Sequence, residues 1–318
     1  MVDIFNDNYN NSNNNSNTKN NFNNFNNKNI SSNNDNTDEP KQHWANIVKR
    51  MTDNTYILKI AYNGNNEGFQ SHPEKKNNVC DIIVRALINC GYMEYYEKPV
   101  LLRGGRTDDG VLALGNFIIV NLIKEPILSH IYSKLKNKGV WVLGYAKINN
   151  LPKIEYRHYR YILPNEGQNL NLMKMCAEKL TGEHSFHNLS KRDNTKNKSM
   201  IRKIYNIEIE ENPFFFTIDI YGKNFLWNMV RRIITVMSKV SLGEKSLNWV
   251  DNLLNPNYNE GVAPAPPNGL ILVNVKTNIQ YKYSDYVIRQ FKNELKEEYR
   301  KNITNSGVSL NMINLLKK

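Results

Sequence analysis

The stretch LLRGGRTDDGVLALGNFIIV, residues 101–120, has an apolar run at each end and a polar, glycine-rich centre. Apolar runs of this length predict two buried strands, and the glycines between them permit the backbone angles of a tight turn. Arg106, Asp108 and Asp109 lie in that turn. A surface hairpin with an ion pair would explain these charges, and on spacing alone it is the favoured reading. The other reading is a carboxylate that an opposite charge keeps ionised, ready to act as a nucleophile or a base.

The hydrophobic pattern on either side of this hairpin predicts a repeated architecture. The first set reads strand, helix, strand, strand, helix, strand, in segments 56–62, 77–92, the hairpin itself, 126–139 and 140–148. This is the order of a split βαβ, or ferredoxin-like, unit. A second set with a related order follows in segments 156–163, 169–186, 201–211, 213–222, 224–243, 247–255 and 269–277. We therefore expect an α+β protein with two ferredoxin-like halves that share one long antiparallel sheet flanked by helices, with a cleft between the halves.

Four regions are predicted along the chain: a disordered tail (1–50), a first domain that carries the hairpin (51–150), a second domain (151–283), and a C-terminal amphipathic helix with its tail (284–318). Half of the first 36 residues are Asn, and such a segment buries too little apolar surface to offset its ordering entropy. In the helix of the second domain, spacing places four residues inward: Leu172, Met175, Cys176 and Leu180. In the last helix it places five on one stripe: Val287, Ile288, Phe291, Leu295 and Tyr299.

The composition favours a polyanionic partner. The formal net charge is +12 and the pI is about 9.4, and excess positive charge attracts nucleic acid. A coding bias toward Lys and Asn would produce the same excess. Cys80, Cys90 and Cys176 form no CxxC pair, which indicates neither a disulfide framework nor a zinc site. No apolar run reaches the roughly 18 residues that span a bilayer, so we expect a cytoplasmic protein without a membrane partner.

Seven segments together resemble one known family. The hairpin segment RGGRTDDGVLALGN (103–116) closely resembles the signature of the TruA-type tRNA pseudouridine synthases, in the variant found in archaea and eukaryotes. The similarity continues in order along residues 55–276. It is carried by AYNGNNEGFQ (61–70), RHYRYIL (157–163), LTGEHSFHNLS (180–190), IRKIYNIEI (201–209), GKNFLWNMVRRI (222–233) and APAPPNGLILVNV (263–275).

The resemblance implies an isomerase that acts on tRNA and uses no cofactor and no metal. The glycosidic bond from C1′ to N1 of a uridine is cut, the uracil turns in its pocket, and C1′ rejoins at C5. Bacterial relatives act on tRNA positions 38–40 in the anticodon stem-loop, which is the expected target here. The resemblance also implies a homodimer with tRNA spanning both subunits.

The same resemblance assigns roles to four residues. Asp108 falls on the nucleophile, and Arg106 on an arginine that pairs with a phosphate or with that aspartate. Tyr159 falls on the tyrosine that stacks on the target uracil, although on its own it reads as a core aromatic residue. Alternation along its strand puts Arg157, Tyr159 and Tyr161 on one face, and His158 and Arg160 on the other. Arg231 falls on the arginine that holds the aspartate in a salt bridge, with Arg232 as the exposed second choice.

A basic loop and one glutamine are the expected tRNA contacts. The segment KRDNTKNKSMIRK (191–203) carries six basic residues, among them Lys191, Arg192 and Arg202. Loops of this kind suit phosphate contacts, which position RNA without reading its sequence, but an ordinary solvated loop has the same composition. Gln70 closes the first motif and is expected to contact substrate.

Three departures from the family pattern and two other functions are considered. Asn63 stands in place of an aspartate, Leu112 in place of a frequent histidine, and Asp109 adds a second carboxylate. A tRNA-binding or RNA-folding protein without catalysis would share the fold, but it would have no chemical need for all four catalytic residues. A metal-dependent nuclease built on Asp108 and Asp109 lacks a further acidic motif, and neighbouring side chains on a strand point apart.

Overall fold

The hairpin forms as β2 (Val100–Arg103) and β3 (Leu112–Asn121), which pair in antiparallel fashion. The structure is a computed structural model that describes residues 44–70, 77–95, 99–191 and 199–316. Strand β3 is buried over most of its length because it also pairs with β1 (Thr55–Tyr62). On the far side of β1 lies β4 (Val140–Lys147). The strand order β4-β1-β3-β2 therefore places the turn of the hairpin at one end of a four-stranded, antiparallel half of the sheet.

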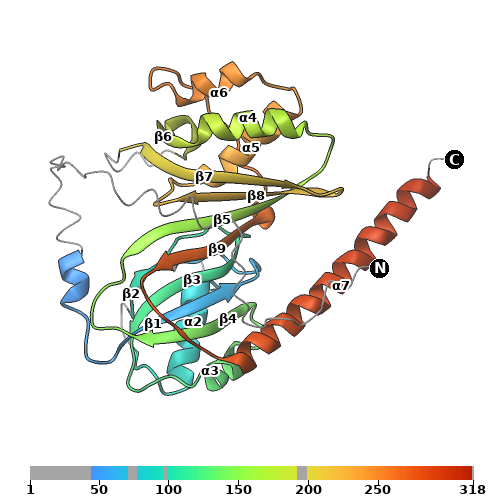
Figure 1. Ribbon diagram of the computed structural model, residues 1–318. Coiled ribbons are helices and arrows are strands. Elements are labelled where there is room, and N and C mark those ends of the chain that lie inside the picture. The colour runs from blue at the N-terminus through green and yellow to red at the C-terminus, as the bar shows by residue number, and fades with distance from the viewer. Residues whose placement is uncertain (1–43, 71–76, 96–98, 192–198, 317–318) are drawn as a thin grey trace, which may run out of the picture. The chain divides into compact units, whose positions relative to one another are not determined.

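The second half repeats this order. Its strands are β5 (Ile154–Pro164), β6 (Gly182–Ser185), β7 (Ile201–Glu211), β8 (Phe215–Gly222) and β9 (Leu270–Thr277). They are arranged as β9-β5-β8-β7, with β6 beside β7. A short strand β10 (Lys282–Tyr283) is added beside β4. The whole forms one ten-stranded sheet that is mostly antiparallel (Figure 1).

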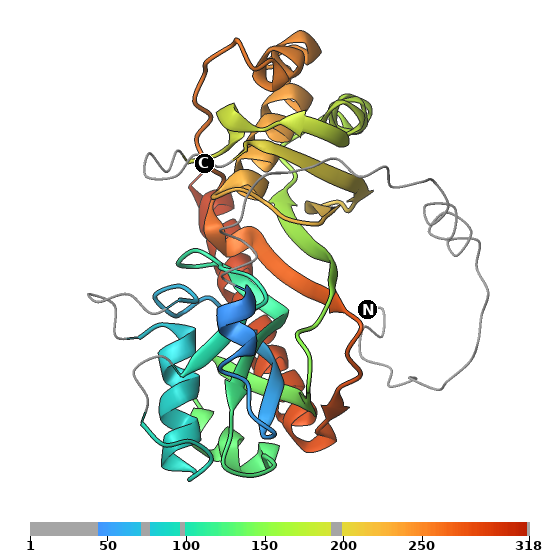
Figure 2. The ribbon, with the colours of Figure 1, turned by 90° about the vertical axis from the view of Figure 1, so that its left-hand side faces the viewer.

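The joint between the halves departs from the expected antiparallel sheet. Strands β3 and β9 pair in parallel, with Leu112 opposite Ile271 and Ala113 opposite Leu272. Figure 2 shows β9 passing between the two halves beside β5. Strand β9 runs antiparallel to β5, and β5 runs in the opposite direction to β3. Strand β9 therefore runs in the same direction as β3, and the two pair in parallel. The joint brings the hairpin turn next to β5 of the other half.

Helices pack on both halves. They are α2 (Val79–Asn89), α3 (Leu128–Leu135), α4 (Leu170–Leu180), α5 (Met229–Ser241) and α6 (Leu247–Leu254). In the first half α2 and α3 contact β4, and in the second half α5 contacts β5 and α4 contacts β7. The apolar faces that dock on the sheet are fully buried, as at Ile83, Met173 and Ile233.

Several expected boundaries were wrong for local reasons. Helix α3 ends at Leu135 rather than near Gly139, because Lys136 leaves the helical region and Asn137 has a φ of 63°. Residues 182–185, expected to be helical, pair with β7 as β6. Met175, expected inward, is 48% exposed, and Met173 fills the core position instead.

The two ends of the chain also differ from expectation. The Asn-rich tail lies outside the described residues as far as residue 43, but Ile47 is buried in the core, so packing begins inside the expected 1–50 tail. The last helix, α7 (Asp285–Leu315), is longer than the pattern predicted. Of its stripe, Val287 and Phe291 are buried, whereas Leu295 and Tyr299 are 41% and 44% exposed.

Candidate active site

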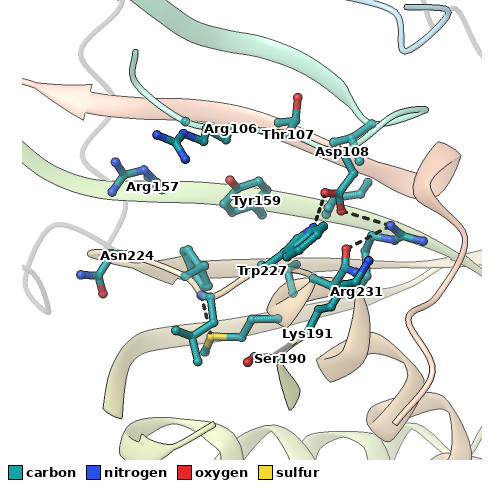
Figure 3. Close-up of a pocket in the computed structure, with 18 of the residues that line it drawn as sticks. Arg106, Thr107, Asp108, Arg157, Tyr159, Ser190, Lys191, Asn224, Trp227 and Arg231 are labelled. Atoms are coloured by element: carbon teal, nitrogen blue, oxygen red, sulfur yellow. Dashed lines mark hydrogen bonds and ion pairs between the residues drawn. The ribbon is translucent and has the colours of Figure 1, made fainter. Parts of the chain in front are cut away.

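A cavity of about 670 Å³ opens beside the hairpin turn, and residues from both halves line it (Figure 3). The first half supplies the turn of the hairpin, and the second supplies β5, the start of the basic loop and the segment that enters α5. The lining of the cavity includes Gln70, Arg106, Thr107, Asp108, Arg157, Tyr159, Lys191, Arg202, Phe225, Trp227 and Arg231. The cavity therefore brings together motifs that are far apart in the sequence.

Buried hydrogen bonds fix the backbone of the turn. The fully buried Asn116 accepts from the Gly105 N–H at 2.9 Å and donates to the Gly105 carbonyl at 3.0 Å. The Phe69 N–H donates to the Thr107 carbonyl, and the hydroxyls of Thr107 and Tyr62 are 2.8 Å apart. A Cβ at Gly104 would lie 2.7 Å from the Phe117 ring, so only glycine fits there. The turn is held rigidly on both sides, which orients the side chain that follows it.

Each oxygen of the Asp108 carboxylate has its own donor. The guanidinium of Arg231 lies 3.2 Å from Oδ2, and the indole N–H of Trp227 donates to Oδ1 at 3.0 Å. The side chains of Arg231 and Asp108 are 13% and 30% exposed. Arg231 is itself locked, because its Nε donates to the Ala265 carbonyl at 2.6 Å and its Nη1 also donates to Asn228. The salt bridge inferred from the sequence is thus present, on the expected arginine.

Arg106 was expected to pair with a phosphate or with Asp108, and the structure does not show the second pairing. The bonds that the structure describes at the Asp108 carboxylate come from Arg231 and Trp227, not from Arg106. Arg106 is exposed and lines the cavity, and Figure 3 shows its guanidinium directed away from the carboxylate. Its positive charge is therefore accessible to a ligand that enters the cavity.

Tyr159 and Arg157 form the wall contributed by β5. Tyr159 is 8% exposed, and its ring meets Phe225 edge to face at 5.2 Å between centroids. Burial raises the pKa of Tyr159 to about 12, so its phenol is protonated at neutral pH. Arg157 donates from Nε and Nη2 to the Gly104 carbonyl at 3.0 and 2.7 Å, and from Nη1 to the Lys223 carbonyl. Arg157 therefore ties the hairpin turn to the second half.

The expected alternation along β5 is confirmed. Arg157 and Tyr159 face the cavity, whereas His158 and Arg160 on the opposite face both bond to Asp219. Burial opposes ionisation of Asp219, but the hydrogen bonds from those two partners outweigh it and lower the pKa of the carboxyl group. Arg160 is therefore committed to an ion pair away from the cavity.

The expected tRNA contacts are found in part. Gln70, Lys191 and Arg202 line the cavity, while Arg192 lies outside the described residues. The Lys191 ammonium stands 4.2 Å from the centre of the Trp227 ring. Arg202 donates to the carbonyls of two neighbouring residues, and its buried Nε has no hydrogen-bond partner among the described residues.

Trp227 and Arg157 are among the cavity residues that sequence reasoning did not assign to the site. Alternation along β5 had placed Arg157 on the same face as Tyr159, and this was enough to predict that Arg157 lines the cavity. No periodicity singles out Trp227, because it lies just before α5 rather than within a regular element. Asn228, the N-cap of that helix, has a left-handed φ of 63°, and the expected helix over 224–243 begins only at Met229 for that reason.

The departures at Asn63 and Asp109 leave the turns intact. The Asn63 N–H donates to the Gly139 carbonyl, and its side-chain oxygen accepts from the Asn65 N–H. Asp109 is exposed.

Within the described parts of the chain, no cluster of three or more His, Cys, Asp and Glu side chains could hold a metal ion. None of the described helices is long and apolar enough to cross a membrane.

The hydrogen-bonded turn presents one oriented carboxylate to a cavity that has an aromatic wall and accessible basic side chains. This arrangement is typical of an enzyme that acts on a nucleotide. The particular family follows from comparison with known proteins. Residues 176–278 match the family described as tRNA pseudouridine synthase.

Curated relatives extend that match to most of the chain. tRNA pseudouridine synthase A of Methanocaldococcus jannaschii is 52% identical over 262 residues, which cover 82% of this chain and 100% of the relative. The same enzyme of Methanococcus maripaludis is 47% identical, over 81% of this chain and 97% of the relative. That of Pyrococcus abyssi is 32% identical, over 81% and 98%. The chain belongs to the TruA family of tRNA pseudouridine synthases.

Proposed function

We propose that this chain converts uridine to pseudouridine in the anticodon stem-loop of tRNA, at positions 38–40, with Asp108 as the nucleophile and without a cofactor. Its family membership makes it a tRNA pseudouridine synthase, an isomerase. The observation that carries the role of Asp108 is the pair of donors on its carboxylate, inside a cavity that both halves line. A carboxylate held in this way keeps one orientation toward the cavity.

The proposed reaction balances without an external reactant. The bond from C1′ to N1 breaks, and after the uracil turns, a bond forms from C1′ to C5. The proton on C5 is lost and N1 gains one, so atoms and charge are conserved. Asp108 forms a transient bond to the nucleotide as the C1′–N1 bond breaks, and that bond breaks when C1′ joins C5, so the carboxylate is regenerated opposite Arg231 at 3.2 Å.

Tyr159 and Arg106 are proposed to hold the extruded nucleotide. The buried, protonated ring of Tyr159 offers an apolar face to the uracil, and extruded bases are commonly read by stacking on aromatic side chains. Arg106 is exposed at the cavity and directed away from Asp108. It is therefore proposed to bind a phosphate beside the target, rather than the aspartate.

The surrounding basic residues are proposed to bind the RNA backbone. Lys191 and Arg202 line the cavity, and Arg192 continues the same loop. Gln70, which lines the same cavity, is proposed to contact the substrate. Phosphate contacts of this kind weaken as salt is added.

Three further features complete the proposal. The strand orders β4-β1-β3-β2 and β9-β5-β8-β7 support two ferredoxin-like halves, with domain limits near residues 51–150 and 151–283. The active molecule is proposed to be a homodimer, with tRNA spanning both subunits, which sedimentation at equilibrium tests. Its proposed location is the cytoplasm, where free thiols such as Cys80 stay reduced.

The deciding experiment is a site-resolved assay on purified tRNA. Transcripts with a single uridine at position 38, 39 or 40 are incubated with the protein, in EDTA and in parallel with Mg²⁺, and pseudouridine is mapped by primer extension after carbodiimide labelling. Formation at one or more of these positions is expected. Tight tRNA binding without any product would favour the non-catalytic alternative, and cleavage that requires Mg²⁺ would favour a nuclease.

A further inference from the structure

Trp227 occupies an unusual place in the cavity. It precedes α5 and its side chain is 50% exposed, so burial in the core does not account for its presence. Figure 3 shows the indole between Asp108 and Lys191. Its N–H donates to Oδ1 of the carboxylate at 3.0 Å. An exposed tryptophan that points at the proposed nucleophile requires another explanation than packing.

The backbone aims this side chain. The Trp227 carbonyl accepts from the Lys191 N–H at 2.9 Å, and the next residue, Asn228, has a φ of 63°. A left-handed non-glycine residue is strained and persists where its surroundings impose it. The Lys191 ammonium lies 4.2 Å from the ring centre, which fixes the outer face of the indole. The indole is thus held from its backbone and from one face.

A second tryptophan, Trp249, makes the same kinds of contact in a buried setting away from the cavity. Trp249 also donates its indole N–H to a carboxylate, that of Glu260 at 2.8 Å, and it too has a lysine ammonium over its ring, that of Lys245 at 5.0 Å. Trp249 is only 8% exposed, and neither it nor its partners line the cavity. The two residues share the same contacts but differ in burial and in place, which makes Trp249 a matched control.

We propose that Trp227 is a positioning residue that fixes the Asp108 carboxylate through Oδ1, as Arg231 does through Oδ2. With one donor on each oxygen, the carboxylate cannot rotate about its bond to Cβ without breaking a hydrogen bond. One orientation is then presented to the nucleotide, which is the condition for efficient attack. This role rests on the proposed function, because it has meaning only where Asp108 reacts.

Two changes at residue 227 separate the N–H from the ring. Trp227→Phe keeps an aromatic ring and removes the donor. Replacement of the indole by benzothiophene, introduced through stop-codon suppression, keeps the full ring area and replaces the N–H by sulfur. Hydrogen bonds to charged groups are stronger than neutral ones, but this site is half exposed, so we expect kcat to fall by about tenfold in both variants. KM and the dissociation constant for tRNA should stay within about twofold of the parent's values.

The assay is pseudouridine formation on an anticodon-arm tRNA transcript, in steady state and in single turnover, with Trp249→Phe as the control. Trp249→Phe should keep the kcat of the parent even if its melting temperature falls. Parent-like kcat in both Trp227 variants, or a loss confined to KM, would refute the positioning role while leaving the enzyme assignment intact. An equal loss of kcat in Trp249→Phe would refute it too. A parent protein that forms no pseudouridine would instead refute the proposed function itself.

Discussion

Replacing Arg231 by alanine removes the charge that faces Asp108 and leaves the remaining structure of the turn in place. Coulomb's law over the 3.2 Å between Nη1 and Oδ2 gives about 5 kcal/mol at an effective dielectric constant of about 20, and about 1.3 kcal/mol in bulk water. The carboxylate is 30% exposed, so a value between these limits applies, about 2 to 3 kcal/mol. Because only the part of this energy that acts in the transition state affects the rate, kcat should fall by at most about 30- to 150-fold.

The assay is single-turnover pseudouridine formation at saturating tRNA, with RNA binding measured separately by filter retention. Arg231→Lys should keep part of the activity, because a charge remains but one ammonium cannot reproduce the bonds to Ala265, Asn228 and Asp108 together. Arg232→Ala is the neighbouring control and should act mainly on tRNA affinity. A near-normal rate in Arg231→Ala, or a larger catalytic defect in Arg232→Ala, would show that the salt bridge does not support the chemistry.

Three more changes test the remaining assignments. Asp108→Asn should abolish product formation while tRNA binding stays within a few-fold, whereas the exposed Asp109 tolerates Asn; the reverse result in the same assay would mean that the wrong carboxylate was chosen. Deletion of residues 1–43 should leave turnover on purified tRNA and the melting temperature almost unchanged, and a large fall in that temperature would contradict this. Lys59→Met should raise the free energy of unfolding at pH 7 by roughly 1 kcal/mol, because burial of Lys59 lowers its pKa to about 8, and this gain exceeds the loss of the bond to Asn274 and of the cation–π contact with Tyr281. Between about pH 8 and 10.5 the unfolded chain binds more protons than the folded one, so the parent gains stability as pH rises, and the advantage of the variant in urea titrations should shrink across that window.

Local patterns predicted the hairpin, most helices and the core of both halves, because each of these depends on short-range periodicity. Alternation along β5 correctly separated Tyr159 from Arg160, since successive side chains of a strand face opposite ways. The pairing of Arg231 with Asp108 was also anticipated. A charge inside an apolar helix needs an acidic partner, and the family resemblance named the aspartate.

Features that depend on how distant segments meet were not predictable in this way. The parallel joint of β3 and β9 follows from the direction in which the chain returns after α6, and hydrophobic periodicity contains no information about direction. The sequence placed Arg157 on the same strand face as Tyr159 but did not assign it a role in the site. Its bonds to the carbonyl of Gly104 exist because the joint brings the hairpin turn against β5.

The site is therefore assembled by the joint between the halves rather than by either half alone. Asp108 comes from one half, and both of its donors, Arg231 and Trp227, come from the other. A change that shifts β9 relative to β3 would separate the carboxylate from both donors at once, although none of the three residues would be altered. Gly115 lies at this joint, and a Cβ there would come within 2.4 Å of the Val273 carbonyl. Substitution of Gly115 should therefore reduce catalysis through the geometry of the site, and its cost in activity should exceed its cost in tRNA affinity.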